Sequence, residues 1–139
     1  MNEQQFKDRT KQFGIHVIKL LEGLPGKRTT DVLARQLLRA ATSIGANYRA
    51  ACRGKSAADV IAKLGIVEEE TDEALYWLEV LVEAGLVAQS EVAGFISEAD
   101  ELLSMIVASI KTLRRRAVEP GPAMLSGQSK IQNLKSKMC

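Results

Sequence analysis

The sequence is dominated by four long segments in which apolar residues recur every three or four positions. That spacing places the apolar side chains along one side of an α-helix, and no segment alternates with the period of two expected of a half-buried strand. Short stretches rich in glycine or proline separate the segments, and only 4% of the residues are aromatic. The sequence therefore predicts an all-α fold of four helices.

The first two predicted helices carry starting and ending signals. Asn2, with Gln5 three positions later, is typical of a capping box, and the first helix is expected to end near Leu21. Thr30 is expected to cap the second helix, which ends before Gly54. The residues expected to face inward are Phe6, Phe13, Val17 and Leu20 on the first helix, and Leu33, Leu37, Ala40, Ile44, Asn47 and Ala51 on the second.

The third and fourth predicted helices are bounded in the same way. Ser56 and Asp59 have the spacing of a capping box, and Gly85 is expected to end the third helix. Ser90 is a candidate cap for the fourth helix, which is expected to end near Arg116. The residues expected to face inward are Ile61, Leu64, Thr71, Leu75, Leu78 and Val82 on the third helix, and Phe95, Ala99, Leu102, Ile106, Ile110 and Leu113 on the fourth.

Each predicted helix has roughly 20–28 residues, which corresponds to about 30–42 Å at 1.5 Å per residue. Because the connections are short, successive helices are expected to be antiparallel, and residues 1–116 to form an up-down-up-down four-helix bundle. Residues 117–139 contain two prolines, two glycines and no apolar stripe that could join the core. We expect them to form a disordered C-terminal tail.

The sequence lacks the residue patterns of common catalytic and metal sites. The single histidine, His16, and acids gathered mostly on one helix cannot surround a metal as the facing pairs of a ferritin-like site do. There is no nucleophile elbow and no glycine-rich phosphate loop. Cys52 lies beside the apolar row of its helix, which favours a buried structural thiol over an activated nucleophile. We therefore expect no enzymatic activity, no cofactor and no metal.

The sequence also lacks features of membrane or secreted proteins. Charged residues interrupt every apolar stretch before it reaches the length of a membrane span, and the segment MNEQQFKDRT has no apolar region of a signal peptide. Two cysteines, Cys52 and Cys139, are too few for a disulfide framework. We expect a cytoplasmic protein with no membrane contact.

The charges are segregated along the chain, although the formal net charge is only +2. Residues 27–63 contain eight Lys and Arg against two acids, whereas residues 64–101 contain eleven acids and no base. Residues 102–139 are basic again, with seven Lys and Arg against one acid. Such segregation produces faces of opposite sign, which suit self-association or a polyanion bound on one face.

Four arginines of the second predicted helix lie opposite its apolar side. With Leu37 at 0°, the apolar residues centre near about 20°, and the arginines lie between about 120° and 200° at 100° per residue. No acid lies between Val32 and Arg53, so no acid one turn away can pair with them. Together with bases elsewhere they form a candidate phosphate-binding surface. The residues expected to bind nucleic acid are Arg35, Arg39, Arg49, Arg53, Lys55, Arg114, Arg115 and Arg116.

Two other interpretations of these arginines stay open: they could pair with acids of a neighbouring subunit, or they could simply face solvent. Small residues on several sides of the second helix permit more than one close helical neighbour, and the third helix has apolar residues outside its inward row. Trp77 could form part of an interface or cover an edge of the bundle. The residues expected at an oligomer interface are Ile66, Glu69, Glu70, Glu73, Tyr76, Trp77 and Val80.

Two blocks of the sequence resemble a known family. The first reads LLRAATSIGANYR at residues 37–49, and the second begins with EEE at 68–70 and continues with LYWLE at 75–79. In this order and at this separation, they resemble the small bacterial four-helix bundle proteins encoded in intervening sequences of 23S ribosomal RNA genes. The resemblance covers roughly residues 6–116.

The resemblance implies an assembly and a set of partners. Proteins of that family are similar to the accessory proteins of diversity-generating retroelements, which are basic homopentameric barrels that act with a reverse transcriptase and nucleic acid. The implied protein is therefore a homopentameric ring without enzymatic activity, with RNA or DNA and a reverse transcriptase as partners. The alternative is a self-assembling scaffold for protein interactions that binds no nucleic acid.

Overall fold

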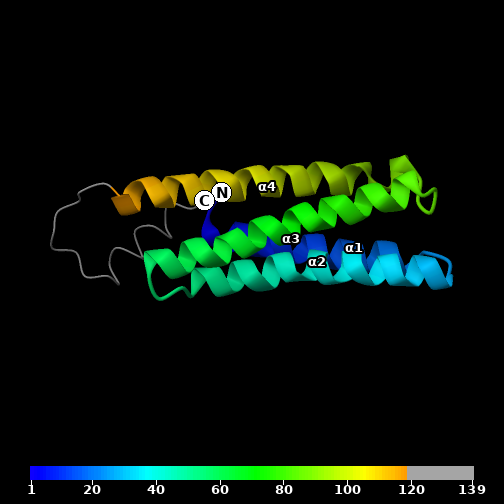
Figure 1. Cartoon of the computed structure of the whole chain (residues 1–139), viewed down its shortest axis with the longest axis horizontal. Coiled ribbons are helices and arrows are strands. Elements are labelled where there is room, and N and C mark those ends of the chain that lie inside the picture. The colour runs from blue at the N-terminus through cyan, green and yellow to red at the C-terminus, as the bar shows by residue number, and fades with distance from the viewer. Residues whose placement is uncertain (119–139) are drawn as a thin grey trace.

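A computed structural model gives the positions of residues 1–118, whose regular structure is entirely helical. The four helices are α1 (Glu3–Glu22), α2 (Arg28–Cys52), α3 (Ala57–Glu83) and α4 (Gln89–Val118). They lie alongside one another, and short connections turn the chain back at each end of the molecule (Figure 1). The predicted all-α fold of four helices is confirmed.

The core runs along the length of the bundle. α2 packs against both α1 and α3, α4 packs against α3, and α1 meets α4 over a smaller area. All four helices contribute fully buried apolar side chains, among them Val17, Leu37, Leu64 and Leu102. Complete burial of one leucine or valine side chain stabilises a fold by about 1.5–3 kcal/mol, so this shared core holds the helices together. No helix within residues 1–118 is long and apolar enough to cross a membrane.

The predicted capping box starts α1. The Asn2 side chain accepts a hydrogen bond from the backbone N–H of Gln5 at 2.8 Å, and the Gln5 side chain accepts one from the Asn2 N–H at 3.0 Å. The predicted Thr30 cap of α2 is wrong, because the helix begins at Arg28 and no side chain caps it. Thr30 is instead buried inside the first turn, with only 3% of its surface exposed.

Ser56 caps α3 as predicted, with its hydroxyl accepting from the Asp59 N–H at 3.0 Å. The Asp59 carboxylate accepts from the N–H of Lys55 rather than from that of Ser56, so the box is displaced by one residue. Gly85 follows the end of α3 with a φ of 74°, a left-handed conformation that glycine adopts without steric cost. The N–H of Leu86 donates to the carbonyl of Leu81, which completes the C-terminal cap.

Two predicted features of α4 differ from the structure. Ser90 is the second residue of the helix and not its cap. The helix continues two residues beyond Arg116, so Ala117 and Val118 are helical and do not belong to a tail. The rest of the predicted tail lies outside the described residues.

The buried row of α3 is shifted from the predicted one. Leu64, Thr71, Leu75 and Leu78 are buried as expected, whereas Ile61 and Val82 are half-buried. The residues that the prediction missed are Val60, Val67, Ala74 and Leu81, all of which are buried. They recur every seven positions and alternate with Leu64, Thr71 and Leu78, which is the spacing of helices packed in a bundle.

Two glycines allow the backbones of α1 and α2 to approach closely. A Cβ atom added to Gly45 would lie 3.3 Å from the backbone nitrogen of Lys11, and one added to Gly14 would lie 3.4 Å from the carbonyl oxygen of Ala41. Larger residues would push the two helices apart.

Candidate nucleic-acid interface

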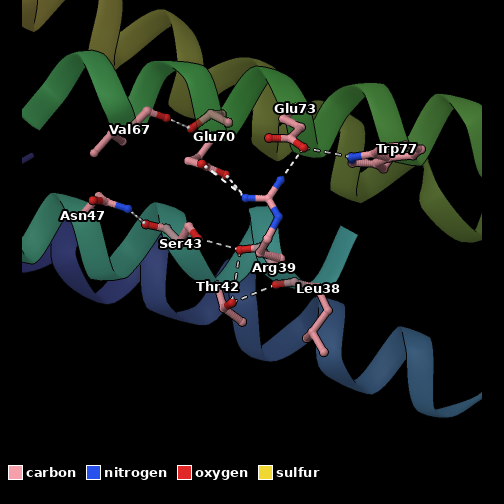
Figure 2. Close-up of polar contacts among 10 residues, drawn as sticks. Leu38, Arg39, Thr42, Ser43, Asn47, Val67, Glu70, Glu73 and Trp77 are labelled. Atoms are coloured by element: carbon pink, nitrogen blue, oxygen red, sulfur yellow. Dashed lines mark hydrogen bonds and ion pairs between the residues drawn. The ribbon is translucent and has the colours of Figure 1, made fainter. Parts of the chain in front are cut away.

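Arg39 is held by two carboxylates of its own chain. Its guanidinium extends from α2 to α3, where it donates to Glu70 at 3.3 Å and also to Glu73 (Figure 2). The indole N–H of Trp77 donates to the same Glu73 carboxylate at 3.2 Å. The hydrogen bond from Arg39 and, next, that from Trp77 lower the pKa of Glu73. We call Arg39, Glu70, Glu73 and Trp77 the α2–α3 clamp.

The clamp adds a contact that was not predicted from the sequence. No acid one helical turn away pairs with Arg39, as expected, but Glu70 and Glu73 pair with it from 31 and 34 residues further along the sequence. Within the chain, these two acids therefore already have an arginine partner. Sequence spacing on one helix cannot reveal such a contact between helices.

Most of the remaining predicted bases gather at one end of the molecule. Arg49, Arg53 and Lys55 lie in the last turn of α2 and just beyond it, and a run of three arginines lies near the end of α4. Figure 1 places the C-terminal ends of α2 and α4 at the same end of the bundle. We define the basic end as Arg49, Arg53, Lys55, Arg114, Arg115 and Arg116, which are exposed except for the half-buried Arg116.

The bases of this end lack acidic partners. Within residues 1–118, none of the six side chains takes part in an ion pair. The nearby acids are already engaged, since Asp59 contacts Lys63 at 3.1 Å and Glu3 lies 3.7 Å from Lys7. The backbone N–H of Lys55 and then the Lys63 ammonium lower the pKa of Asp59. Within residues 1–118, the basic end therefore carries positive charge that forms no ion pair with a carboxylate.

Arg35 lies apart from the basic end. It is exposed and stands fourteen residues before Arg49 on α2, which is about 21 Å along the helix. The eight predicted bases thus divide into the basic end, the clamped Arg39 and an isolated Arg35. These eight bases therefore do not form one continuous surface.

A groove lies between α1 and α2. It has a volume of about 530 Å³, and Gly14, Gly45, Ala46 and Ile15 line it together with the 40% exposed Ile18. Four bases, Lys7, Lys11, Arg49 and Arg53, also line it with one acid, Asp8, so the charge of the groove is positive on balance. Sequence reasoning noted the small residues of α2 but missed the groove, for which Gly14 on α1 was the available signal. We call this feature the α1–α2 groove.

The exposed side of α3 carries acids and two large apolar side chains. Ile66 is 42% exposed and Tyr76 is 56% exposed, and the Tyr76 ring contacts that of Trp77 with centroids 4.9 Å apart. Val80, also predicted at an interface, is half-buried. We define the α3 outer stripe by its exposed residues at successive three- and four-residue steps: Ala62, Ile66, Glu69, Asp72, Tyr76, Glu79 and Glu83.

The comparisons with known proteins identify the family. The model of the 23S rRNA-intervening sequence protein family matches residues 2–108. The chain belongs to this family. The crystal structure of a protein of unknown function from the S23 ribosomal protein family of Bacteroides thetaiotaomicron is also similar, with a TM-score of 0.72 and 32% sequence identity. The alignment covers 76% of this chain and 98% of that one, and no match was found among curated proteins.

The match to the 23S rRNA-intervening sequence protein family includes some surfaces and leaves out others. The α2–α3 clamp, the α1–α2 groove and the α3 outer stripe lie within the matched residues. Arg114, Arg115 and Arg116 lie beyond residue 108 and so outside the match. The basic end of this member therefore combines α2 residues inside the family match with an arginine run that follows it.

The surroundings of Cys52 are those of a structural residue of the core. Cys52 is only 6% exposed, and burial, followed by the nearby Glu3, raises the pKa of its thiol to about 12. Such a thiol is a poor nucleophile at neutral pH. Within residues 1–118, no three His, Cys, Asp or Glu side chains are grouped so that they could hold a metal ion.

Proposed function

We propose that this protein is a non-enzymatic, self-assembling bundle of the cytoplasm that binds the phosphates of RNA or DNA through its basic end. The subunit is an antiparallel up-down-up-down bundle, and the assembly is the homopentameric ring that the family resemblance implies. The observation that supports phosphate binding is the presence, at one end of the bundle, of six bases that form no ion pair within residues 1–118.

The chemistry of the basic end suits a polyanion. An arginine guanidinium can donate two parallel hydrogen bonds to a phosphate, and five of the six bases are arginines. Phosphate neutralisation releases counterions, so binding weakens steeply as salt increases. Repetition of the surface around a ring would add the avidity of several linked contacts.

Arg39 and Arg35 are not part of this surface. Arg39 would have to give up two carboxylate partners before it could contact a phosphate, and Arg35 lies too far along α2 to act with Arg53. The proposed nucleic-acid surface is therefore smaller than the one predicted from sequence.

A second candidate function is a scaffold for protein interactions without nucleic acid. The groove between α1 and α2 and the exposed apolar residues of α3 favour it, because protein interfaces combine apolar contacts with a polar rim. A reverse transcriptase is one partner that the family resemblance implies for either function.

Binding of a labelled structured RNA, measured by fluorescence anisotropy at several salt concentrations, tests the proposal. The variant Arg114→Ala/Arg115→Ala/Arg116→Ala removes three bases of the basic end. If all three contact phosphate, the slope of log K against log salt becomes shallower by about 2.7.

The matched control Lys19→Ala/Arg28→Ala/Arg35→Ala removes the same charge from exposed positions away from the basic end. It is expected to leave most of the affinity and the slope intact. Equal losses in both variants would mean that net charge alone attracts RNA, and the proposal would be rejected. A wild-type protein that binds no RNA at low salt would favour the scaffold.

A further inference from the structure

We infer that the α3 outer stripe of one copy docks into the α1–α2 groove of a second copy. The inference rests on the self-assembly part of the proposed function, and it names the two surfaces that meet. Neither surface is used by the core or by the basic end of the same subunit, apart from the shared rim residues Arg49 and Arg53.

The shape of the groove suits a helix. Gly14, Gly45 and Ala46 line it. The two glycines face the other helix of the α1–α2 pair, so the exposed Ala46 is the small residue that an incoming helix can approach. A second cavity of about 410 Å³, lined by Ile18, Leu38 and neighbouring residues, adjoins it because both cavities share Ile18. The exposed side chains of Ile66 and Tyr76 are apolar groups of the size needed to fill such cavities.

The charges of the two surfaces are opposite. Lys11 and Arg49 line the groove, and neither takes part in an ion pair within residues 1–118. On the α3 outer stripe, Glu69 and Asp72 are exposed and likewise unpaired in the described chain. Opposite charges at an interface raise the association rate and fix the register of the partners.

The spacing along the two helices also agrees. Lys11 and Ile18 are seven residues apart on α1, and Glu69 and Tyr76 are seven residues apart on α3. Both distances correspond to about two helical turns, or about 10.5 Å. When the α3 of one copy runs parallel to the α1 of the next, Glu69 meets Lys11 while Tyr76 reaches the apolar part of the groove near Ile18.

Each copy offers a groove between α1 and α2 and a stripe on α3. When the second groove and the second stripe of a pair engage further copies, the contact is heterologous, and its repetition produces a closed ring or an open filament. Lys55 and the arginines of α4 lie outside the groove, so these bases of the basic end stay available when the groove is filled. Docking and phosphate binding can therefore occur together.

Light-scattering mass, measured over a range of concentrations without RNA, tests the docking. Ala46→Trp fills the groove at an exposed position and is expected to yield a monomer of about 15.2 kDa. Ala108→Trp, at an exposed position of α4 outside the groove, is the matched control and is expected to assemble as the wild type does. Unchanged far-UV circular dichroism and thermal unfolding establish that both variants fold.

Charge reversal gives a second test. Lys11→Glu and Glu69→Lys each place like charges opposite one another, and each is expected to weaken association by roughly tenfold or more. The double variant Lys11→Glu/Glu69→Lys restores opposite charges and is expected to recover most of the association. Rescue by the double variant identifies Lys11 and Glu69 as partners across the interface.

The outcomes separate the docking from the function that it serves. An oligomer of unchanged mass in Ala46→Trp and in both charge variants overturns the docking but leaves self-assembly standing. A wild-type protein that stays at 15.2 kDa at every concentration overturns both docking and self-assembly. Neither result bears on phosphate binding, which the anisotropy experiment with the arginine variants of α4 measures independently.

Discussion

The guanidinium of Arg9 on α1 meets the carboxylate of Glu98 on α4 at two points, with nitrogen–oxygen distances of 2.6 and 2.8 Å. Glu101 adds a third contact at 2.9 Å. Within residues 1–118, these are the only ion pairs between α1 and α4, which meet over a smaller area than the other neighbouring helices. Because the Arg9 guanidinium contacts Glu98 through two nitrogens, this ion pair is the main polar contact between α1 and α4.

Replacement of Arg9 by alanine is expected to lower the free energy of unfolding by about 1–3 kcal/mol, because Glu98 loses a charged hydrogen-bond partner in a partly buried place. Lys7→Ala removes an ion pair of 3.7 Å within one helix, and it is expected to change the free energy of unfolding by about 0.5 kcal/mol or less. Urea denaturation measures both. Equal changes in the free energy of unfolding would show that the Arg9–Glu98 pair stabilises the fold no more than the ion pair of Lys7 does.

Gly54→Ala is expected to destabilise the fold by about 1–3 kcal/mol. An added Cβ would lie far within the van der Waals contact distance of a methyl group of the buried Val60, and only 3.1 Å from the Ala51 carbonyl oxygen. Gly65→Ala is the matched control, because nothing lies within 4 Å of its added Cβ and the residue is inside α3. That change is expected to stabilise by about 0.5–1 kcal/mol, since alanine favours helices. Thermal unfolding of the two variants would contradict this explanation if both melted below the wild type.

Cys52 is expected to react with Ellman's reagent only when the bundle opens. Its thiol is buried and has a pKa of about 12, so at pH 8 almost none of it is the reactive thiolate. The experiment uses Cys139→Ser, which leaves Cys52 as the single thiol. A cysteine introduced by Ala62→Cys, at an exposed position of α3, should react quickly in the same folded protein. Rapid modification of Cys52 without denaturant would contradict the buried position.

The emission of Trp77, the one tryptophan of the chain, is expected to report on the protonation of Glu73. Because Arg39 and Trp77 lower the pKa of Glu73, the clamp stabilises the fold above the usual glutamate pKa of about 4.3. That contribution is lost as the pH falls through the lowered pKa. An acid titration of the fluorescence should therefore show a transition below about pH 4.3.

Glu73→Gln should remove that transition, because glutamine does not titrate. Glu79→Gln, at an exposed position of the same helix, should leave it in place. A transition that persists unchanged in Glu73→Gln would mean that another acid controls the indole.

Local signals predicted much of the fold. Asn2 and Ser56 begin their helices and Gly85 follows the end of α3, because each acts through atoms only a few residues away. The row of α3 was harder to predict, since apolar residues occur on several sides of that helix. Steps of three and four residues counted from Ile61 fit the sequence nearly as well as steps counted from Val60, which give the row that the structure buries.

The candidate site depended on contacts that periodicity cannot reveal. The outward direction of Arg39 was predictable from α2, but its capture by Glu70 and Glu73 depends on how α2 and α3 align. The groove likewise depends on the close approach of α1 and α2, in which Gly14 faces Ala41 and Gly45 faces Lys11. Such features follow from the packing of helices and appear only when neighbouring helices are placed together.

The course of the four helices determines where the protein can be labelled. α1 begins and α4 reaches Val118 at the end of the bundle that also carries Arg53 and Lys55 (Figure 1). A fluorescent protein or affinity tag fused to the N-terminus would therefore stand beside the surface proposed to bind RNA. The turn between α1 and α2, at the opposite end and with exposed Pro25 and Gly26, is the better place for a reporter group.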